Sequence, residues 1–317
     1  MEPTFSVVIP THNRKDSLRR CLEAVTHQDY ADYEVIVVDD GSTDSTGEMV
    51  QREFPQVRYI RQEPNQGPAA ARNRGIKAAS GEIIAFTDDD CIPPTNWLAS
   101  HLPYYDDPQV GGVGGLQLTA RPNFIEQFQI AHYLDVYTEF HRICRVEAVR
   151  GFGTNNLSIR REVFDHAGLF DEAFLTGADP ELTRRVAIAG YTLIRDPKLR
   201  VEHLKVDTLG SYLHTRFRRG CGSVLTDIKY GTLCIRRFLP LVNPKHALQT
   251  WRNFRKARGK AYRKGDLLSF LALLLLTRIV EVAGRLYYYQ KVGRDYTPSA
   301  EAVVRHQRTS GEPTGVN

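Results

Sequence analysis

Three consecutive aspartates, Asp88 to Asp90, are the most informative reactive side chains in the sequence. They follow residues 82–86, EIIAF, a run whose β-branched and aromatic content is typical of a strand. Carboxylates one residue apart, such as Asp88 and Asp90, can coordinate a hard divalent cation. Mg²⁺ or Mn²⁺ held in this way usually takes substrate phosphate as a further ligand. A solvated acidic turn is the competing interpretation, and for an isolated triplet it is the commoner one.

Other polar segments also follow apolar runs in the first half of the chain. Asp39 and Asp40 follow residues 34–38, and Thr11 follows residues 5–9 closely. Residues 64–75, PNQGPAAARNRG, have the composition of a helix start with basic side chains. Taken alone, each segment also fits an ordinary turn or helix cap, so its residues do not define a function.

Short apolar runs alternate with helical patterns through this half of the chain. The predicted strands are residues 5–9, 34–38, 57–60 and 82–86. Continuous apolar strands separated by helices predict an α/β fold with a mostly parallel sheet and helices on both faces. Ligands in such folds bind beyond the carboxyl ends of the strands. The pattern therefore predicts that the polar segments after these strands lie together in one crevice.

The second half is less regular. Strands are predicted at residues 111–118 and 154–159, and helices at 124–144, 180–189 and 208–228. From Lys245 to Lys264 there are eight Lys or Arg residues and no acidic residue, and the apolar run Leu267–Leu276 follows. The polar tail after Tyr296 is predicted to be disordered.

Composition narrows the class of protein. The 317 residues are 42% hydrophobic with a net charge of +5, which indicates a globular protein with a mild basic excess. We find no zinc-finger or RNA-binding signature, so a nucleic-acid partner is not expected. The five cysteines are widely spaced without a CxxC pair, which favours a reducing compartment. The first residues do not resemble a secretory signal, so we expect a cytoplasmic protein.

The order of the motifs resembles glycosyltransferase family 2. Its motifs match PTHNR at residues 10–14, VVDDGSTDST at 37–46, PNQGPAAARNRG at 64–75 and FTDDDC at 86–91. A weaker resemblance continues to about residue 230. The resemblance implies the GT-A fold of nucleotide-diphospho-sugar transferases, which is Rossmann-like. It also implies a transfer reaction that inverts the configuration at the anomeric carbon. It further implies an NDP-sugar donor, with a UDP-sugar favoured, and Mg²⁺ or Mn²⁺ as cofactor.

The same resemblance assigns donor-side residues. It implies donor binding by Pro10, Thr11, Arg14, Asp40, Arg72, Asp88 and Asp89. Asp40 matches the residue that accepts a hydrogen bond from the nucleotide base, and Arg72 is a helper near base or phosphate. Asp88 and Asp90 match the DxD metal pair, while Asp89 is a candidate ribose contact. Many members carry a further Asp where this chain has Cys91, which leaves the ligand set open.

The acceptor side resembles the family more loosely. Residues 151–156, GFGTNN, resemble its acceptor-side strand, and residues 168–172, GLFDE, resemble its GGFDE segment. In GADPEL, residues 177–182, the resemblance implies Asp179 as the catalytic base, with Ala178 in place of the usual Glu. An Asp before Pro is equally a good helix N-cap. His203 matches a late His that some GT-A enzymes place near the metal, although a lone His is more often a core or surface residue.

The predicted domain limits follow from these motifs. Residues 1–230 form the GT-A domain, with a donor half to about 118 and an acceptor half from about 119. Residues 231–295 form a basic and apolar helical region, and residues 296–317 a tail. Two alternatives stay open. A sugar-1-phosphate nucleotidylyltransferase would usually show a Gly-rich loop that residues 5–20 lack, whereas Ala178 keeps open a degenerate nucleotide- or carbohydrate-binding protein.

The composition of the C-terminal region predicts contact with a membrane. A basic cluster before an apolar run is attracted to anionic lipid. A run of ten residues, interrupted only by Ser269, is too short to cross a bilayer, which needs about 20. Residues 266–289 are therefore interpreted first as a helix lying in the interface. A buried helix and a true span are the alternatives. The expected acceptor is a glycan or a lipid-linked sugar, and the expected location is the cytoplasm or the inner face of the cytoplasmic membrane.

Overall fold

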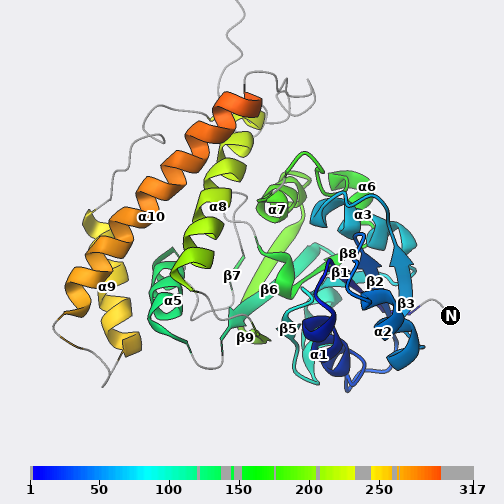
Figure 1. Cartoon of the computed structure of the whole chain (residues 1–317). Helices are drawn as coiled ribbons and strands as arrows, with labels where there is room; N and C mark the ends of the chain where they lie inside the picture. Colours follow the sequence, from blue (N-terminus) through cyan, green and yellow to red (C-terminus); the bar gives the residue numbers. More distant parts are fainter. Residues whose placement is uncertain are drawn as a thin grey trace, which may run out of the picture. The chain divides into compact units, whose positions relative to one another are not determined.

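The computed structural model describes residues 3–119, 122–136, 144–145, 152–174, 176–204, 208–232, 244–258, 263 and 265–293 (Figure 1). The chain divides into two compact units. The first comprises Met1–Ala120 and Glu139–Lys205, and the second comprises Arg121–Thr138 and Val206–Asn317. The predicted tail, residues 296–317, lies outside the described residues.

A mixed, mostly parallel sheet forms the centre of the first unit. Among the described residues its strand order is β3-β2-β1-β4-β8-β6-β9-β5, with β7 paired to β9. The strands are β1 (Phe5–Thr11), β2 (Tyr33–Asp39), β3 (Arg58–Arg61), β4 (Ile83–Phe86), β5 (Cys91–Ile92), β6 (Val110–Leu118), β7 (Cys144–Arg145), β8 (Leu157–Arg160) and β9 (Thr192–His203). Strands β1 to β4 pair in parallel, whereas β8 runs antiparallel to β4 and β6.

Helices cover the sheet of the first unit. They are α1 (Lys15–Val25), α2 (Thr46–Glu53), α3 (Pro68–Ala78), α4 (Trp97–His101), α6 (Val163–Ala167) and α7 (Ala178–Ile188), with short 3-10 turns η1 (Leu102–Asp106) and η2 (Thr154–Asn156). Alternate residues of β1 point to opposite faces. Val7 and Ile9 join a buried core with residues of α1 and α2. Val8 faces α3, where a Cβ on Gly75 would lie 2.3 Å from its Cγ1. Glycine therefore lets α3, which carries Arg72, lie directly on the sheet.

Two predicted elements differ from the structure. The helix predicted at residues 124–144 is α5 (Phe124–Val136), and Cys144 lies instead in β7, paired with Arg195 of β9. The strand predicted from Thr154 begins only at Leu157, because Thr154–Asn156 form the turn η2. The Asn156 side chain holds this turn in place: its amide donates to the carbonyl oxygens of Leu116 and Leu199, and its oxygen accepts from the Trp97 indole.

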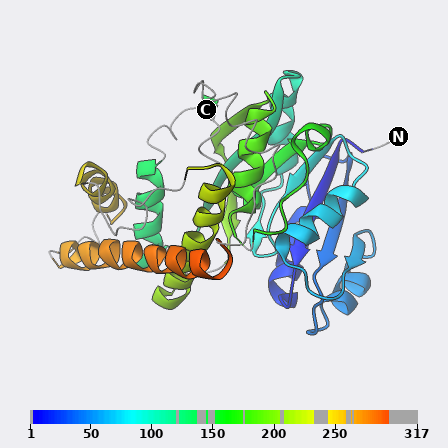
Figure 2. The same ribbon diagram turned by 90° about the horizontal axis from the view of Figure 1, so that it is seen from above.

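The second unit is helical. Its helices are α5, α8 (Leu209–Lys229), α9 (Pro244–Arg258) and α10 (Asp266–Tyr288), followed by a short π-helical turn η5 (Tyr289–Gly293). Helices α8 and α10 lie side by side in Figure 1 and cross in Figure 2. A Cβ on Gly220 would lie 2.1 Å from the carbonyl oxygen of Glu281, and one on Gly284 2.1 Å from that of Phe217. The two glycines therefore allow the backbones to touch.

The compact units group α8 with α9 and α10, although the sequence-based domain limit near residue 230 put α8 with the catalytic domain. The functional limits stay a prediction. Within the described residues, Asp266–Lys291 has a mean hydropathy of 2.0 and a third of it is buried. By length and composition it could cross a membrane, which the ten-residue apolar run alone does not predict.

Candidate active site

The carboxyl ends of three parallel strands bring the predicted site residues together. Thr11, the last residue of β1, pairs with Asp39 at the end of β2, and Val8 pairs with Phe86 at the end of β4. The segment after Phe86 therefore lies beside Thr11. The Thr11 hydroxyl donates to Asp89 Oδ2 over 2.8 Å, which is the first direct contact between two predicted motifs. Pro10 is buried in β1 next to this contact.

Two arginines neutralise part of the aspartate cluster. Arg14, directly before α1, donates to Asp89 Oδ1 over 3.0 Å and to Asp90 Oδ2 over 2.7 Å. Arg72 of α3 is buried and donates to Asp88 Oδ1 over 2.8 Å. These contacts satisfy several of the carboxylate oxygens and hold the loop 87–90 in one conformation.

His203 lies beside Asp90, although the two are far apart in the sequence. Strand β5 pairs antiparallel with β9, so that Cys91 stands opposite His203. The Leu204 amide donates to the Asp90 carbonyl, and His203 Nε2 lies 3.3 Å from Asp90 Oδ1. The pairing of β5 with the end of β9 therefore supplies an imidazole next to the aspartates.

The three aspartates have different proton affinities. Burial raises the pKa of Asp89 to about 6, against the opposing charge of Arg14. Burial also raises the pKa of Asp88, although Arg72 opposes the shift. Burial acts on Asp90 too, but its contacts with His203 and Arg14 outweigh it and lower the pKa of that carboxyl. Adjacent carboxylates in a partly desolvated site favour a further positive charge.

Asp179 lies at the start of α7 and reaches the same network. Its Oδ2 accepts from the Thr154 amide over 3.2 Å and from the Thr154 hydroxyl over 3.1 Å. Its Oδ1 lies 3.9 Å from Arg72 Nη1. The N-cap of α7 is Gly177, and no side chain caps this helix end. The carboxylate of Asp179 therefore faces Thr154 and Arg72, and the N-cap interpretation of this residue is wrong.

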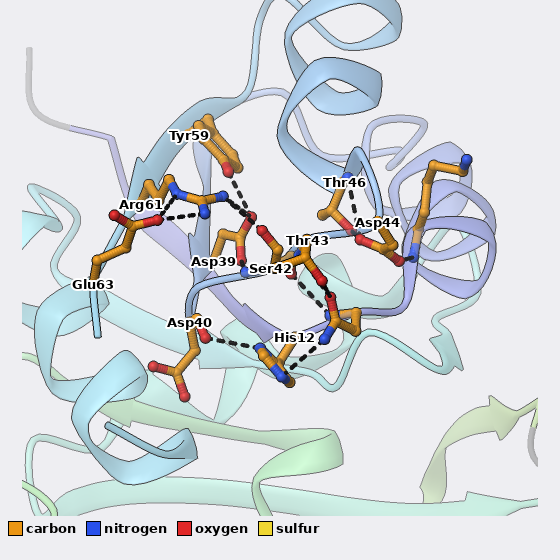
Figure 3. Close-up of polar contacts among 12 residues, drawn as sticks. His12, Asp39, Asp40, Ser42, Thr43, Asp44, Thr46, Tyr59, Arg61 and Glu63 are labelled. Carbon is orange, nitrogen blue, oxygen red and sulfur yellow. Dashed lines mark hydrogen bonds and ion pairs between the residues drawn. The ribbon is translucent and has the colours of Figure 1, made fainter. Parts of the chain in front are cut away.

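Asp40 has a different environment. Its carboxylate accepts from the Gln62 side chain over 2.6 Å and from the backbone amides of Gln66 and Gly67 over 2.8 Å each. Gly67 is the N-cap of α3, so the Asp40 carboxylate satisfies amides at the start of this helix. In Figure 3 the carboxylate points away from the His12 ring, which donates instead to the Asp40 carbonyl oxygen over 2.8 Å.

The loops after β1 and β2 are tied together around Asp40 (Figure 3). Asp39 is fully buried and accepts from the Ser42 amide and the Tyr59 hydroxyl. The Asn13 amide oxygen accepts from the Thr43 amide over 2.7 Å. In the DDGS motif, Asp39 thus holds the loop after β2, and Asp40 holds the start of α3.

The structure links most of the predicted residues by direct contact. They are Thr11, Arg14, Arg72, Asp88, Asp89, Asp90, Asp179 and His203. The Asp40 backbone amide donates to the Thr11 carbonyl oxygen over 2.9 Å, whereas the Asp40 carboxylate is bonded to Gln62 and to the start of α3. Pro10 directly precedes Thr11 in β1. Thr154 was not predicted, although it lies in GFGTNN, because nothing in that segment marks which residue contacts Asp179. Gln62 was also missed, since a lone Gln after a short strand carries no signal.

The residues fit a divalent cation that keeps water and phosphate ligands. Four carboxylates, Asp88, Asp89, Asp90 and Asp179, face two guanidinium groups in the linked network. In the part of the chain that the structure describes, no three acidic, His or Cys side chains form a ready-made metal cage. Mg²⁺ and Mn²⁺ are often held by one or two carboxylates plus substrate phosphate. Asp88 and Asp90 have this chemistry, and His203 supplies a neighbouring imidazole beside Asp90.

Comparison with known proteins identifies the class. The model of glycosyl transferase family 2 matches residues 6–168. Glycosyltransferase AglE of Haloferax volcanii is 31% identical over 302 residues, covering 90% of this chain and 96% of AglE. A GalNAc(5)-diNAcBac-PP-undecaprenol beta-1,3-glucosyltransferase of Campylobacter jejuni is 39% identical over 92 residues, which cover 28% of this chain and 30% of that protein. The chain belongs to glycosyl transferase family 2 and is a glycosyltransferase.

A solved structure confirms the fold. The mannosyltransferase PcManGT from Pyrobaculum calidifontis, in complex with GDP-Man and Mn²⁺, matches with a TM-score of 0.64 and 22% identity over 92% of this chain and 88% of its own. The predicted GT-A fold with a helical C-terminal part is therefore confirmed. Family membership does not favour the nucleotidylyltransferase or the degenerate binding protein.

Proposed function

We propose that the protein transfers a sugar from a nucleotide-diphosphate sugar to a hydroxyl group of a glycan or lipid-linked acceptor, with inversion at the anomeric carbon. One observation carries the proposal: Arg72 contacts Asp88 and lies 3.9 Å from Asp179. A carboxylate suited to activate an acceptor thus lies in the same network as the carboxylates suited to a donor diphosphate. A UDP-sugar is favoured by the family motifs, while PcManGT binds GDP-Man.

On the donor side, we propose that Asp88, Asp90 and His203 hold Mg²⁺ or Mn²⁺. When bound, the cation would neutralise charge on the departing diphosphate. Arg14 and Arg72 supply fixed positive charge around the same oxygens. The Arg72 Nε is buried and has no acceptor among the described residues, so it is a candidate donor to a phosphate oxygen. The Mn²⁺ in the PcManGT complex supports a metal of this kind.

The nucleotide is proposed to lie against Pro10, Thr11 and Asp40. The two Asp40 oxygens offer about four lone-pair sites and three internal donors use them. One lone pair of the Asp40 carboxylate thus remains to accept a hydrogen bond from an N–H of the nucleotide base. Asp89, held by Thr11 and Arg14, is the candidate for the ribose.

On the acceptor side, Asp179 is proposed as the general base. Its Oδ2 is fixed by Thr154, and an acceptor hydroxyl that donates to this carboxylate would lose its proton as its oxygen attacks the anomeric carbon. With one base and one displacement, the configuration inverts. Thr154 acts through Asp179 and is therefore a positioning residue.

The decisive experiment is a donor screen that measures NDP release, followed by Asp179→Asn in the active pair. We expect transfer to fall by a factor on the order of a hundred or more, because a general base contributes about that much, while nucleotide binding is kept. Thr154→Val should lower kcat with little change in donor KM, and Thr154→Ser should restore most of it. Unchanged transfer in Asp179→Asn would exclude this residue as the base.

The location follows from the second unit. We propose a cytoplasmic protein with peripheral contact at the inner face of the cytoplasmic membrane, and residues 1–230 and 231–295 as its catalytic and membrane-facing regions. The name of the Campylobacter jejuni relative, which includes a PP-undecaprenol substrate, supports a lipid-linked acceptor.

A further inference from the structure

The outer face of α10 is apolar along its whole length. Its inner face is buried in the second unit through residues that include Phe270, Leu273 and Leu274. The opposite side exposes Leu268, Leu271, Leu275, Ile279 and Leu286, which we call the leucine face. Their exposed fractions lie between 45% and 74%. At 1.5 Å per residue this stripe is about 27 Å long. A helix that borders water normally carries polar residues on its outer side.

Helix α9 exposes a row of cations beside it. Lys245, Arg252, Arg255 and Lys256 are exposed and recur at helical spacing, and we call them the basic face. Helix α9 contacts α10 through the tilted ring pair of Trp251 and Phe270, with ring centroids 5.0 Å apart. The ion pair of Arg258 with Asp266 over 3.1 Å adds a second link. These two contacts join the helix that carries the basic face to the helix that carries the leucine face.

Among the described side chains of this unit, the exposed charged ones are basic. Among its described side chains the carboxylates are turned inward: Glu126, Asp227 and Asp266 are buried, and Glu281 is nearly so. Glu281 lies 2.9 Å from Arg278 and 3.4 Å from Arg216. The carboxylates whose side chains are described in this unit are therefore largely withdrawn from solvent.

We infer that the leucine face and the basic face together form a docking surface for an anionic lipid bilayer, with α10 lying in the plane of the interface. The leucine side chains enter the acyl boundary, and the basic face binds the acidic headgroups. Tyr287, half exposed beside Lys291, is suited to the headgroup level. The inference extends the proposed membrane contact and does not depend on the identity of the catalytic base.

The contacts of α8 favour an in-plane helix over a span. Helix α8 touches α10 through Tyr212 and Thr277 and through Cys221 and Gly284. It also exposes His214, Arg218 and Arg219, which a transmembrane α10 would draw toward hydrocarbon at considerable cost. A second copy of the chain is the other possible occupant, but two copies would bring two basic faces together, which is unfavourable.

Flotation of the full chain with vesicles tests the inference. We expect it to float with vesicles of phosphatidylcholine and phosphatidylglycerol at low salt, and much less with phosphatidylcholine alone. Leu271→Glu with Leu275→Glu should abolish flotation. Arg252→Gln, Arg255→Gln and Lys256→Gln together should weaken partitioning on the order of a hundredfold, from about 1 kcal/mol per cation.

Matched control variants carry the same types of substitution outside the leucine face and the basic face. Leu209→Glu alters an exposed leucine of α8, and the triple variant Arg20→Gln, Arg52→Gln and Lys77→Gln removes three exposed cations of the first unit. Both should float like the parent. Three results overturn the inference: a parent that stays soluble beside anionic vesicles, retention after an alkaline carbonate wash, or a leucine-face variant that changes only the oligomeric state in light scattering. Because flotation needs no donor, its failure is separate from a loss of NDP release.

Discussion

Replacing Asp40 with Ala tests whether this aspartate is first a structural residue. The carboxylate is 4% exposed and accepts one side-chain and two backbone donors, all within 2.8 Å. Each hydrogen bond to a buried charge contributes about 1.5–3 kcal/mol, and removal leaves the donors unsatisfied. The start of α3 also loses a favourable negative charge. With three bonds at the lower of these figures, we expect Asp40→Ala to lower the free energy of unfolding by about 4–5 kcal/mol.

Thermal unfolding is the assay. For a unit of this size a loss of 1 kcal/mol lowers Tm by about 2–4 °C, so the expected fall is on the order of 10 °C. Asp16→Ala is the control, since its side chain is 84% exposed and pairs only with Arg19, and it should change Tm little. A parental Tm in Asp40→Ala would refute the structural reasoning.

The role of Asp40 in base recognition is measured separately. Asp40→Asn keeps the shape and one acceptor oxygen, but its NH₂ group would face an internal donor. We expect a smaller loss of stability, and weaker UDP binding measured well below the new Tm. If the folded variant and the parent bind UDP with equal affinity, Asp40 does not recognise the nucleotide base. Its role is then only to stabilise the start of α3.

The remaining predictions concern the metal and a buried histidine. Asp90→Ala should abolish Mn²⁺-dependent NDP release while the fold is kept, as checked by Tm; near-normal turnover across a Mn²⁺ titration would remove Asp90 from the ligand set. Burial lowers the pKa of His101 to about 4, whereas the unfolded chain binds the proton near the ordinary value of about 6.5. Its stabilisation is therefore full above pH 6.5 and is lost as the pH falls toward 4, by about 3 kcal/mol. His101→Gln should remove this part of the acid sensitivity in urea unfolding between pH 7 and pH 4.5, and parallel curves for variant and parent would contradict it.

The donor side of the site was predictable because its geometry is local to each strand. Thr11, Asp39 and Asp88 each stand at or just beyond the end of a parallel strand. Parallel strands end at one edge of the sheet, so spacing alone brings these residues together. The contact of Thr11 with Asp89 follows from this rule without knowledge of any other part of the chain.

The position of His203 could not be derived in that way. It depends on the pairing of the two-residue strand β5 with the end of β9, and a run as short as Cys91–Ile92 has no readable period. The same holds for β7, whose first residue, Cys144, was predicted as the end of a helix. Such strands form because a longer neighbour offers them an edge, and this information is absent from their own residues.

The different roles of Asp39 and Asp40 in the DDGS motif also could not be predicted from the sequence. Asp39 and Asp40 are chemically identical neighbours, and both are candidates for a turn, a cap or a ligand contact. The choice is made by residues from elsewhere, since Tyr59 donates to Asp39 and Gln62 donates to Asp40. A resemblance to a family indicates which residue matches a functional position. The hydrogen-bond partners of that residue determine how many of its lone pairs remain for a substrate.

Arg72 explains why the donor and acceptor sides form a single site. It comes from α3, which lies close to β1 because Gly75 has no side chain. Its guanidinium contacts Asp88, lies 3.9 Å from Asp179 and stands 5.9 Å from the centre of the Phe170 ring. Nearby carboxylates without this cation would repel one another and take up protons. A buried cation between them favours the charged form of Asp88, which the proposed phosphate contact needs, and it lies close to Asp179, the proposed base.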